Sequence, residues 1–186
     1  MNDDIFFKPR SGEEVTRATR DEAPIVMYST LCEAARRTSI EDVFEKMFSI
    51  SRKYLILLQD PANMNSGHWL GLVYVPDARK NVYFFSSYGG KPDVEKLRWI
   101  QRPDLKKSRQ DINFFNNGLK HLCKRGWVIH YNDHPYQFDG DNTATCGIWT
   151  AAFLNSNMNP EQFYRYNLRR HMGAREYYFK YFRKHD

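Results

Sequence analysis

The residues best suited to chemistry in this chain are one cysteine, Cys146, and one histidine, His68. A thiol becomes a good nucleophile at neutral pH when its pKa is lowered, and the amino end of a helix and a nearby imidazolium both lower it. Cys146 lies between a polar stretch, residues 141–145, and an apolar run that begins at Gly147, so we expect it where a loop enters a helix. Gly147 leaves room beside the sulfur for a substrate carbonyl and for backbone N–H groups that point at it. A small buried helix cysteine is the commoner alternative at such a position.

His68 is the candidate general base. It opens a predicted strand after a loop that contains Pro, Asn and Gly, where a side chain can face a cleft and Trp69 can shelter the ring from water. Histidine suits the role because its pKa lies near neutrality. A lone histidine at this position would more often be structural, so its pairing with Cys146 depends on the surrounding motifs.

Four motifs follow one another along the chain in an informative order. They are Gly67-His68-Trp69, a hairpin ending in residues 84–90, Gln137, and Thr145-Cys146-Gly147-Ile148-Trp149. Over residues 25–157 this order resembles the adenain/Ulp1-like cysteine proteases. That family includes maturation proteases of adenoviruses, of other large DNA viruses and of virophages, and the SUMO-specific proteases.

The resemblance implies a role for each motif. The His of the His-Trp pair is the base and the Cys of the Cys-Gly pair is the nucleophile, which assigns these roles to His68 and Cys146. A glutamine shortly before the cysteine supplies the amide of the oxyanion hole, which points to Gln137, although its distance from Cys146 along the chain is longer than the family usually shows. Trp69 is expected to form a wall of the cleft.

The third member of the triad departs from the family pattern. It should end the strand after the His68 strand, within Phe-Asp/Glu/Asn-Ser/Pro-aromatic-Gly, and here that position is Ser86. A hydroxyl can accept the imidazole N–H and fix the tautomer, but it carries no charge to stabilise protonated His68. Either a thiolate–imidazolium pair suffices, or another acid such as Asp93 or Asp133 takes the role. We expect weakened rather than abolished activity.

Two other patterns suggest different chemistry. His130 and His134 are four residues apart, but His130 ends a predicted strand and His134 precedes a proline, so they do not share a helical face and no metal site is predicted. The tail, residues 160–186, is expected to be helical, basic and aromatic, and could grip a nucleic-acid backbone. We favour an amphipathic helix whose aromatic residues pack inward. Thiol chemistry requires no cofactor.

The elements that must position these residues follow from apolar periodicity. Ser39 is a predicted N-cap for a helix at about residues 40–50, and the loop 76–80 is a predicted hairpin turn. Further helices are predicted near residues 94–99, 112–123 and 147–154, and strands over 54–58, 69–75, 81–85 and 127–131. The expected fold is α+β, a mixed or antiparallel sheet flanked by helices with Cys146 at a helix N-terminus, and the resemblance makes it the papain-related adenain/Ulp1-like fold.

Composition limits the class of protein. With 186 residues, 41% hydrophobic and 16% aromatic, the chain is expected to form one domain, residues 1–186, with residues 1–23 as a flexible arm. Three cysteines without a zinc or redox spacing indicate a reducing compartment, and the acidic N-terminus and the lack of a long apolar run argue against secretion and membrane insertion. A net charge of +6 favours polyanionic surroundings without indicating a nucleic-acid site.

The resemblance implies a cysteine endopeptidase that cleaves viral capsid or scaffold polyproteins during virion maturation, after Gly or other small residues. It would act in the virion and in the host cytoplasm or nucleus, and a DNA or peptide activator is compatible with it. Two alternatives stay open. One is an isopeptidase that removes ubiquitin-like modifiers, and the other is a catalytically weak relative that binds protein or DNA.

Overall fold

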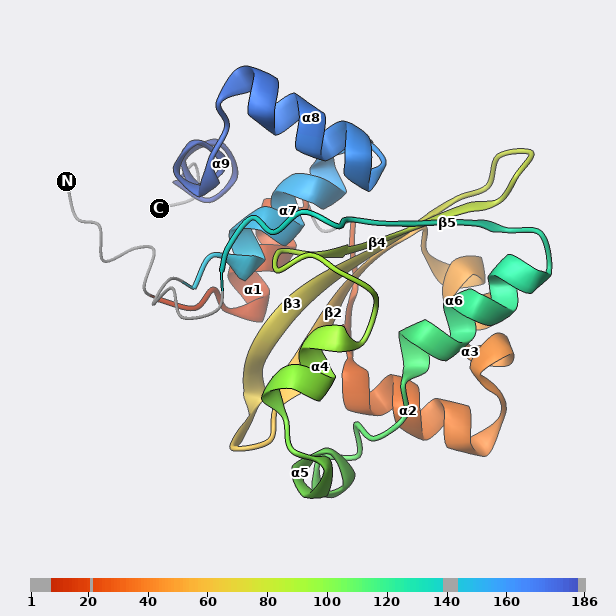
Figure 1. The fold of residues 1–186 in the computed structure, drawn as a ribbon. Helices are drawn as coiled ribbons and strands as arrows, with labels where there is room; N and C mark the ends of the chain where they lie inside the picture. Colours follow the sequence, from red (N-terminus) through yellow and green to blue (C-terminus); the bar gives the residue numbers. More distant parts are fainter. Residues whose placement is uncertain (1–7, 21, 139–143, 184–186) are drawn as a thin grey trace.

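The computed structural model describes residues 8–20, 22–138 and 144–183, and its centre is a five-stranded mixed sheet (Figure 1). In spatial order the strands are β1 (Ile25–Met27), β2 (Lys53–Asp60), β3 (Asn63–Val75), β4 (Asn81–Ser86) and β5 (Val128–Tyr131). The three central strands are antiparallel, and each edge strand is parallel to its neighbour. The chain is therefore α+β, as predicted.

The sheet is apolar on both faces because strand residues alternate between two cores. Leu55 and Leu57 of β2 belong to one core, and Ile56 and Leu58 belong to the other. The first core is covered by α1 (Gly12–Ala18), α7 (Cys146–Ser156), α8 (Pro160–Arg170) and α9 (Ala174–Tyr181). The second is covered by α2 (Tyr28–Arg37), α3 (Ile40–Ile50) and α6 (Phe114–Lys124). Figure 1 shows these two groups of helices above and below the sheet.

Helix α7 is the central helix of the first core. Its residues from Gly147 to Leu154 are all buried, so it is apolar on every side, as expected of a helix that is packed on all sides. It lies against β3, where a side-chain carbon added at Gly71 would be 3.4 Å from both Phe153 and Thr150. The small Gly71 thus lets the helix that begins at Cys146 lie close to the strand that carries His68.

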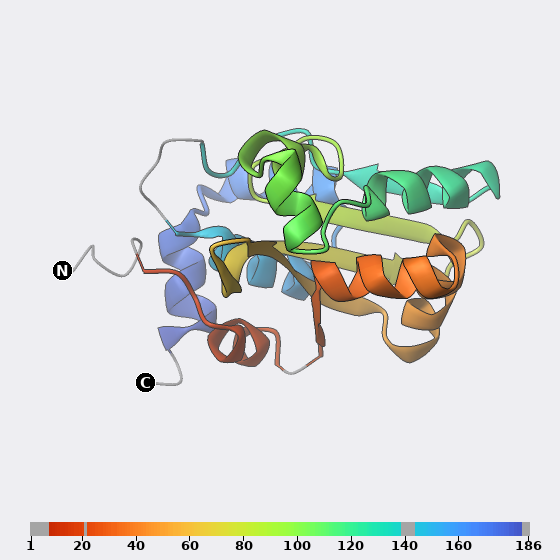
Figure 2. The ribbon, with the colours of Figure 1, turned by 90° about the horizontal axis from the view of Figure 1, so that it is seen from below.

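Two short helices, α4 (Val94–Trp99) and α5 (Arg102–Lys107), follow β4 and lie together beside the sheet (Figure 2). Helix α4 begins after Asp93, which has a left-handed backbone conformation with φ 69°. Its apolar residues are largely turned outward, since Leu97 and Trp99 are exposed. Its buried side chains are Glu95 and Lys96, an inversion of the usual pattern.

The N-terminal segment differs from the predicted flexible arm, because within it residues 12–18 form α1. Ser11 Oγ accepts the Glu14 N–H at 3.2 Å, and Glu14 Oε2 accepts the Ser11 N–H at 2.8 Å, which is a complete capping box. Val15 and Ala18 are buried against α7. The capping box and these two apolar residues account for the order of this segment; residues 1–7 and 21 lie outside the described part.

Most predicted elements are confirmed. The helix after Ser39, the buried strand of residues 54–58 and the hairpin between β3 and β4 appear where they were expected. Strand β1 and helices α2 and α5 were not predicted from the sequence. Aromatic residues of α8 and α9 pack into the first core, as favoured for the tail. Within the described ranges, no helix combines the length and the apolar character needed to cross a membrane.

Candidate active site

One pocket of about 440 Å³ brings together the candidate nucleophile, base and oxyanion residue. Cys146, His68 and Gln137 all line it, although they come from a helix, a strand and a loop. A larger pocket of about 610 Å³ lies between α2 and α3, but its lining includes neither a cysteine nor a histidine. The smaller pocket is therefore the candidate site.

Cys146 is the first residue of α7 and is partly buried. Burial raises the pKa of its thiol, and the backbone N–H groups of Trp69, Gly147 and Cys146 itself oppose that rise without cancelling it. The sulfur is thus surrounded by donors that would stabilise negative charge, but the resting thiol is protonated at neutral pH.

His68 lies on β3 opposite Leu58 and is 7% exposed. Its Nε2 is 3.1 Å from Ser86 Oγ. The register explains the contact, because Ser86 on β4 pairs with Leu70, the next residue of β3 on the same face as His68. Burial lowers the His68 pKa to about 3, so the resting imidazole is neutral.

Two aromatic rings form the wall of the pocket beside His68. The Tyr88 ring centroid is 5.0 Å and the Trp99 centroid 5.6 Å from that of His68, and the two aromatic rings are 4.4 Å from each other. Trp69 was predicted to form this wall, but its side chain is 5% exposed in the first core, and its Nε1–H donates to the Arg10 carbonyl at 3.1 Å. Strand alternation turns Trp69 away from the pocket, so it contributes a backbone N–H instead.

Cys146 and His68 share the pocket without being hydrogen-bonded to each other within the described part of the chain. The backbone N–H of Trp69, the residue after His68, acts on the Cys146 sulfur. The two side chains are therefore in one pocket but lack the hydrogen bond that direct proton transfer requires.

Gln137 reaches the pocket despite its long separation from Cys146. Its Oε1 accepts the Thr145 hydroxyl at 2.7 Å, and its backbone N–H donates to the Ser87 carbonyl at 3.2 Å. Because Thr145 directly precedes Cys146, this bond joins the amide to the start of α7. The Gln137 Nε2 amide group then remains to donate a hydrogen bond to a ligand.

Ser86 is fully buried at the end of β4. Asn132 fixes its backbone on both sides: Asn132 Oδ1 accepts the Ser86 N–H at 3.0 Å, and Asn132 Nδ2 donates to the Ser86 carbonyl at 2.6 Å. The Tyr88 N–H donates to Ser86 Oγ at 3.3 Å. Asn132 was not singled out in the sequence, and its place directly after β5 is the only signal that could have indicated it.

Neither Asp93 nor Asp133, the two acids suggested as third member of the triad, is hydrogen-bonded to His68 in the described part of the chain. Asp93 accepts the Tyr28 hydroxyl at 2.6 Å and the Asn116 N–H at 2.8 Å, and Asp133 is exposed. A different carboxyl lies near Ser86: Glu95 is 2% exposed, and the Ser86 hydroxyl lowers the pKa of its carboxyl. The helix of residues 94–99 was predicted without any indication of which of its side chains are buried.

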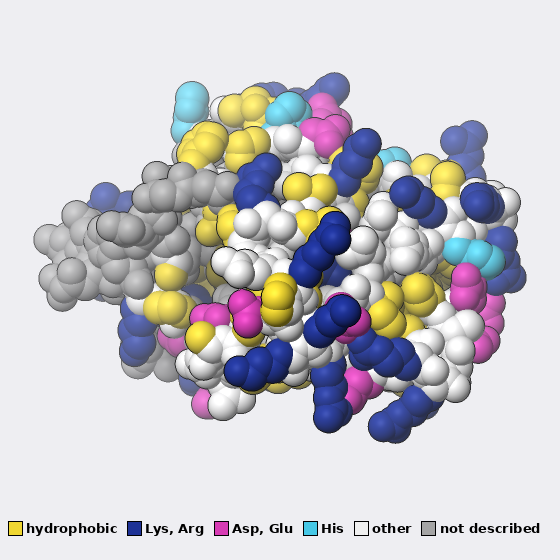
Figure 3. Space-filling model, turned by 60° about the horizontal axis from the view of Figure 1, so that its bottom comes forward, with side chains coloured by type: hydrophobic (Ala, Val, Ile, Leu, Met, Phe, Trp, Pro, Cys, Tyr) yellow, Lys and Arg dark blue, Asp and Glu magenta, His cyan; other side chains and the backbone are white. Residues whose placement is uncertain are grey.

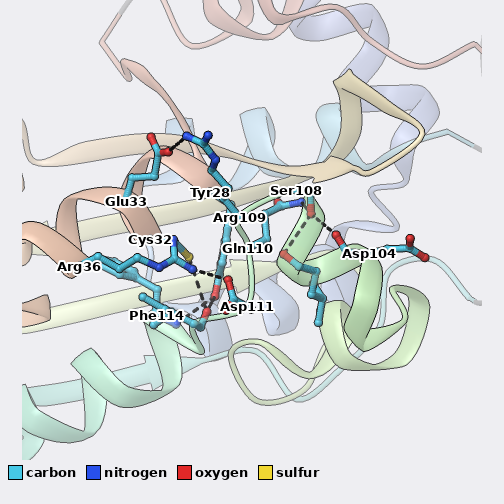
Figure 4. A network of polar contacts seen from close by, with 12 residues as sticks. Tyr28, Cys32, Glu33, Arg36, Asp104, Ser108, Arg109, Gln110, Asp111 and Phe114 are labelled. Atoms are coloured by element: carbon cyan, nitrogen blue, oxygen red, sulfur yellow. Dashed lines mark hydrogen bonds and ion pairs between the residues drawn. The ribbon is translucent and has the colours of Figure 1, made fainter.

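Polar contacts fix α4 and the segment of residues 108–114, and Figure 4 shows those that this segment makes with residues of α2. Lys96, fully buried, donates to the Ile112 carbonyl at 2.6 Å, the Gln110 carbonyl at 3.0 Å and the Tyr28 hydroxyl at 3.1 Å. Gln110 in turn exchanges two 2.9 Å hydrogen bonds with the backbone of Gln59, which lines the pocket. The pocket wall is thereby joined to the second core.

Gly147 packs against the N-terminal segment. A side-chain carbon at this position would be 3.0 Å from both Arg10 Cβ and Val15 Cγ2, and 3.3 Å from Trp69. The close approach of α7 to α1 therefore accounts for a glycine here, and its predicted role beside a substrate stays a prediction.

The two histidines considered as metal ligands have other partners. His130 Nε2 is 3.0 Å from Asn81 Oδ1, and the His134 ring stacks on Tyr164 at 3.8 Å. No group of three or more His, Cys, Asp or Glu side chains suited to a metal ion occurs in the described ranges.

Comparison with known proteins gives no family assignment: no family model matches the chain, and neither does any curated protein.

Proposed function

We propose that the protein is a cysteine peptidase of the adenain/Ulp1-like, papain-related type, with Cys146 as nucleophile and His68 as general base. The observation that carries the proposal is the single pocket lined by both residues and by Gln137. The position of Cys146 at the start of α7 adds to it, because a helix N-terminus and free backbone N–H groups stabilise a thiolate and an oxyanion. The mixed sheet with helices on both faces is compatible with this fold.

The proposed reaction begins with both groups neutral. His68 takes the thiol proton as the sulfur attacks the scissile carbonyl, and the backbone N–H of Cys146 and the Gln137 amide bind the oxyanion. His68 then gives its proton to the leaving amine as the C–N bond breaks. Water, deprotonated by His68, hydrolyses the thioester and releases the acid.

Closer contact between sulfur and imidazole is required at the moment of attack. Catalytic hydrogen bonds are often long in unliganded sites and tighten when substrate binds. A bound substrate, or an activating peptide or DNA, would act at this step if it moved the start of α7 toward β3.

The resemblance of the motif order leads us to propose viral capsid or scaffold proteins as substrates, cleaved after Gly or another small residue. The aromatic wall of Tyr88 and Trp99 beside His68 supports a narrow site. The class of substrate is tested by incubating the purified protein with Gly-Gly-X peptides and, separately, with ubiquitin-like conjugates. Cleavage of the peptides alone is expected, whereas release of the modifiers would favour an isopeptidase.

Cys146→Ala is the decisive variant in that assay, and Cys123→Ser is its matched control, because Cys123 is exposed on the far helix α6. Cleavage is expected to disappear in the first variant and to persist in the second. Persistence of cleavage in Cys146→Ala would remove the peptidase assignment.

A second candidate function is a binding module without catalysis, and the missing contact between Cys146 and His68 favours it. A DNA ligand is the less favoured form of this candidate. Figure 3 shows that Lys and Arg side chains are spread over one face with Asp and Glu among them. Three arginines are paired with acids: Arg36 with Asp111, Arg109 with Glu33, and Arg125 with Glu45. DNA affinity that falls steeply with salt would support phosphate contacts, and a flat response would exclude them.

A further inference from the structure

This chain has Ser86 where the family pattern has an acid, but a buried acid, Glu95, lies near that serine. Glu95, on the buried side of α4, is 2% exposed, and it lies near enough to Ser86 for the serine hydroxyl to lower the pKa of its carboxyl. Its Oε1 atom is buried and has no hydrogen-bond partner within the described residues. A buried carboxylate without full solvation is costly, so its retention at this place calls for an explanation.

We propose that Glu95 is a positioning residue that acts through the Ser86 hydroxyl to set the tautomer of His68 and to stabilise its protonated form. The inference rests on the proposed cysteine peptidase function. It adds a residue that touches neither substrate nor sulfur, and it makes Ser86 a relay between an acid and the base.

The direction of the hydrogen bonds among Glu95, Ser86 and His68 follows from which of these groups can donate a proton. In the proposed relay an ionised Glu95 can only accept a hydrogen bond, so the Ser86 hydroxyl must turn its proton toward the carboxylate. Ser86 Oγ, which already accepts the Tyr88 N–H at 3.3 Å, must then accept from His68 Nε2 at 3.1 Å. His68 is thereby held with its proton on Nε2, and Nδ1 is left as the basic nitrogen.

The position of Glu95 is firmly held because Asp93, two residues before it, and Lys96, directly after it, are both anchored. Asp93 is bonded to the Tyr28 hydroxyl and the Asn116 N–H, and Lys96 donates to three acceptors. Ser86 is held from the other side by Asn132. Relay geometry of this kind is useful only when each member is fixed by its own partners.

Burial raises the Glu95 pKa to about 7, and the charged groups around it act in both directions. The Ser86 hydroxyl and the positive charge of Arg98 lower this pKa, whereas the negative charge of Asp93 raises it. The relay is therefore expected to be engaged above about pH 7 and released below it, where a protonated Glu95 can donate to Ser86 and reverse the hydrogen bonds.

The test reads the tautomer directly. In ¹⁵N-histidine-labelled protein at a pH about one unit above the Glu95 pKa, the imidazole shifts of His68, assigned by their loss in His68→Asn, report which nitrogen carries the proton. Wild type is expected to show Nε2–H. Glu95→Gln presents an amide donor to Ser86 and is expected to shift the population toward Nδ1–H, whereas the surface control Glu45→Gln is expected to match wild type.

The consequence for the nucleophile is measured in the same variants, at the pH of the tautomer measurement, as the alkylation rate of Cys146 by iodoacetamide, with the modified peptide located by mass spectrometry. Loss of the relay is expected to slow alkylation about tenfold, which corresponds to a change of one unit in the His68 pKa. In a Ser86→Ala background, Glu95→Gln is expected to cause no further change, because the link between the two residues is already absent.

The relay is overturned if the His68 tautomer and the alkylation rate of Glu95→Gln equal those of wild type, or if wild type carries Nδ1–H above pH 7. Failure of the peptidase proposal gives a different result. In that case His68→Asn would leave the alkylation rate of Cys146 unchanged, while the tautomer of His68 would still respond to Glu95→Gln. Unfolding midpoints of all variants check that each is folded.

Discussion

His68 Nε2 lies 3.1 Å from Ser86 Oγ, and this contact determines which ring nitrogen is available to a thiol. Both residues lie on the central hairpin, in a register fixed by the pairing of Leu70 with Ser86. The sheet therefore orients the proposed base, while the start of the helix that carries Cys146 is joined to Gln137 through Thr145. We propose that such a site works with a serine where an acid was expected because the Glu95 carboxyl lies near that serine.

Gln137 is expected to contribute to turnover through its amide nitrogen. Gln137→Glu keeps the oxygen that accepts the Thr145 hydroxyl but replaces the N–H donors, so it removes the oxyanion contact with little change in shape. Loss of one oxyanion donor typically lowers kcat by about 10²- to 10³-fold. Steady-state kinetics on a cleaved peptide measure this effect, and Gln162→Glu on α8 serves as the control. An unchanged kcat in Gln137→Glu would exclude Gln137 from the oxyanion hole.

Glu95 is expected to make stability depend on pH. Its folded-state pKa is about 7 against an ordinary value of 4.5, so the folded protein prefers the protonated form. Stability associated with that preference is present below about pH 4.5 and is lost as the pH rises toward 7. By linkage the loss amounts to about 3 kcal/mol at most. Urea unfolding between pH 4.5 and 8 measures the free energy of unfolding of wild type and of Glu95→Gln. The variant is expected to gain stability relative to wild type as the pH rises, and a difference that does not change with pH would contradict the raised pKa of Glu95.

Lys96 is expected to contribute strongly to stability because its ammonium group is buried among three acceptors. Burial lowers its pKa, and Asp93 opposes that change. Lys96→Met removes the cation and leaves the Asp93 carboxylate and two carbonyl groups without their positively charged partner. Removal of one member of a buried charge pair typically lowers the free energy of unfolding by about 3 to 5 kcal/mol. The difference is expected to shrink at acid pH, where Asp93 is protonated. Chemical denaturation checks this, with Lys106→Met on the exposed side of α5 expected to be near wild type.

Gly118 on α6 is expected to tolerate no side chain. An added carbon would be 2.2 Å from Phe44 Cε2 and 2.7 Å from Ile40 Cγ2, and Phe44 is itself stacked on Phe114 at 5.0 Å. Gly118→Ala should therefore force the second core apart, at a cost of about 1 to 3 kcal/mol or more. Gly71→Ala, where the nearest atoms are at 3.4 Å, is expected to cost less. Equal thermal midpoints for the two variants would show that the core yields more easily than the contacts indicate.

The elements that could be predicted from the sequence are those whose own residues determine them. The apolar run of residues 54–58, the turn between residues 75 and 81 and the cap at Ser39 carry their signals locally. Helix α4 was predicted, but not the side that it buries. Lys96 is buried because the hydroxyl of Tyr28, far away in the sequence, accepts from it, and Glu95 is buried near Ser86 of the preceding strand. No local pattern of residues encodes these contacts.

The candidate site shows the same division. Cys146, His68 and Gln137 could be placed in one pocket from motif order. Trp69 was assigned to the cleft wall because it adjoins His68, yet adjacent strand residues point to opposite faces. The wall consists instead of Tyr88 and Trp99, which the turn after β4 and helix α4 bring to the base. Such contacts depend on tertiary packing.

The most direct test of the central claim is covalent capture by a Gly-Gly peptide that ends in an electrophile such as a vinyl ester, followed by mass spectrometry of the intact and digested protein. A peptidase with Cys146 as nucleophile and His68 as base is expected to give one adduct, located on Cys146, that forms much more slowly in His68→Asn. Labelling that falls on the exposed Cys123 instead, or that proceeds on Cys146 at the same rate without His68, would contradict the claim.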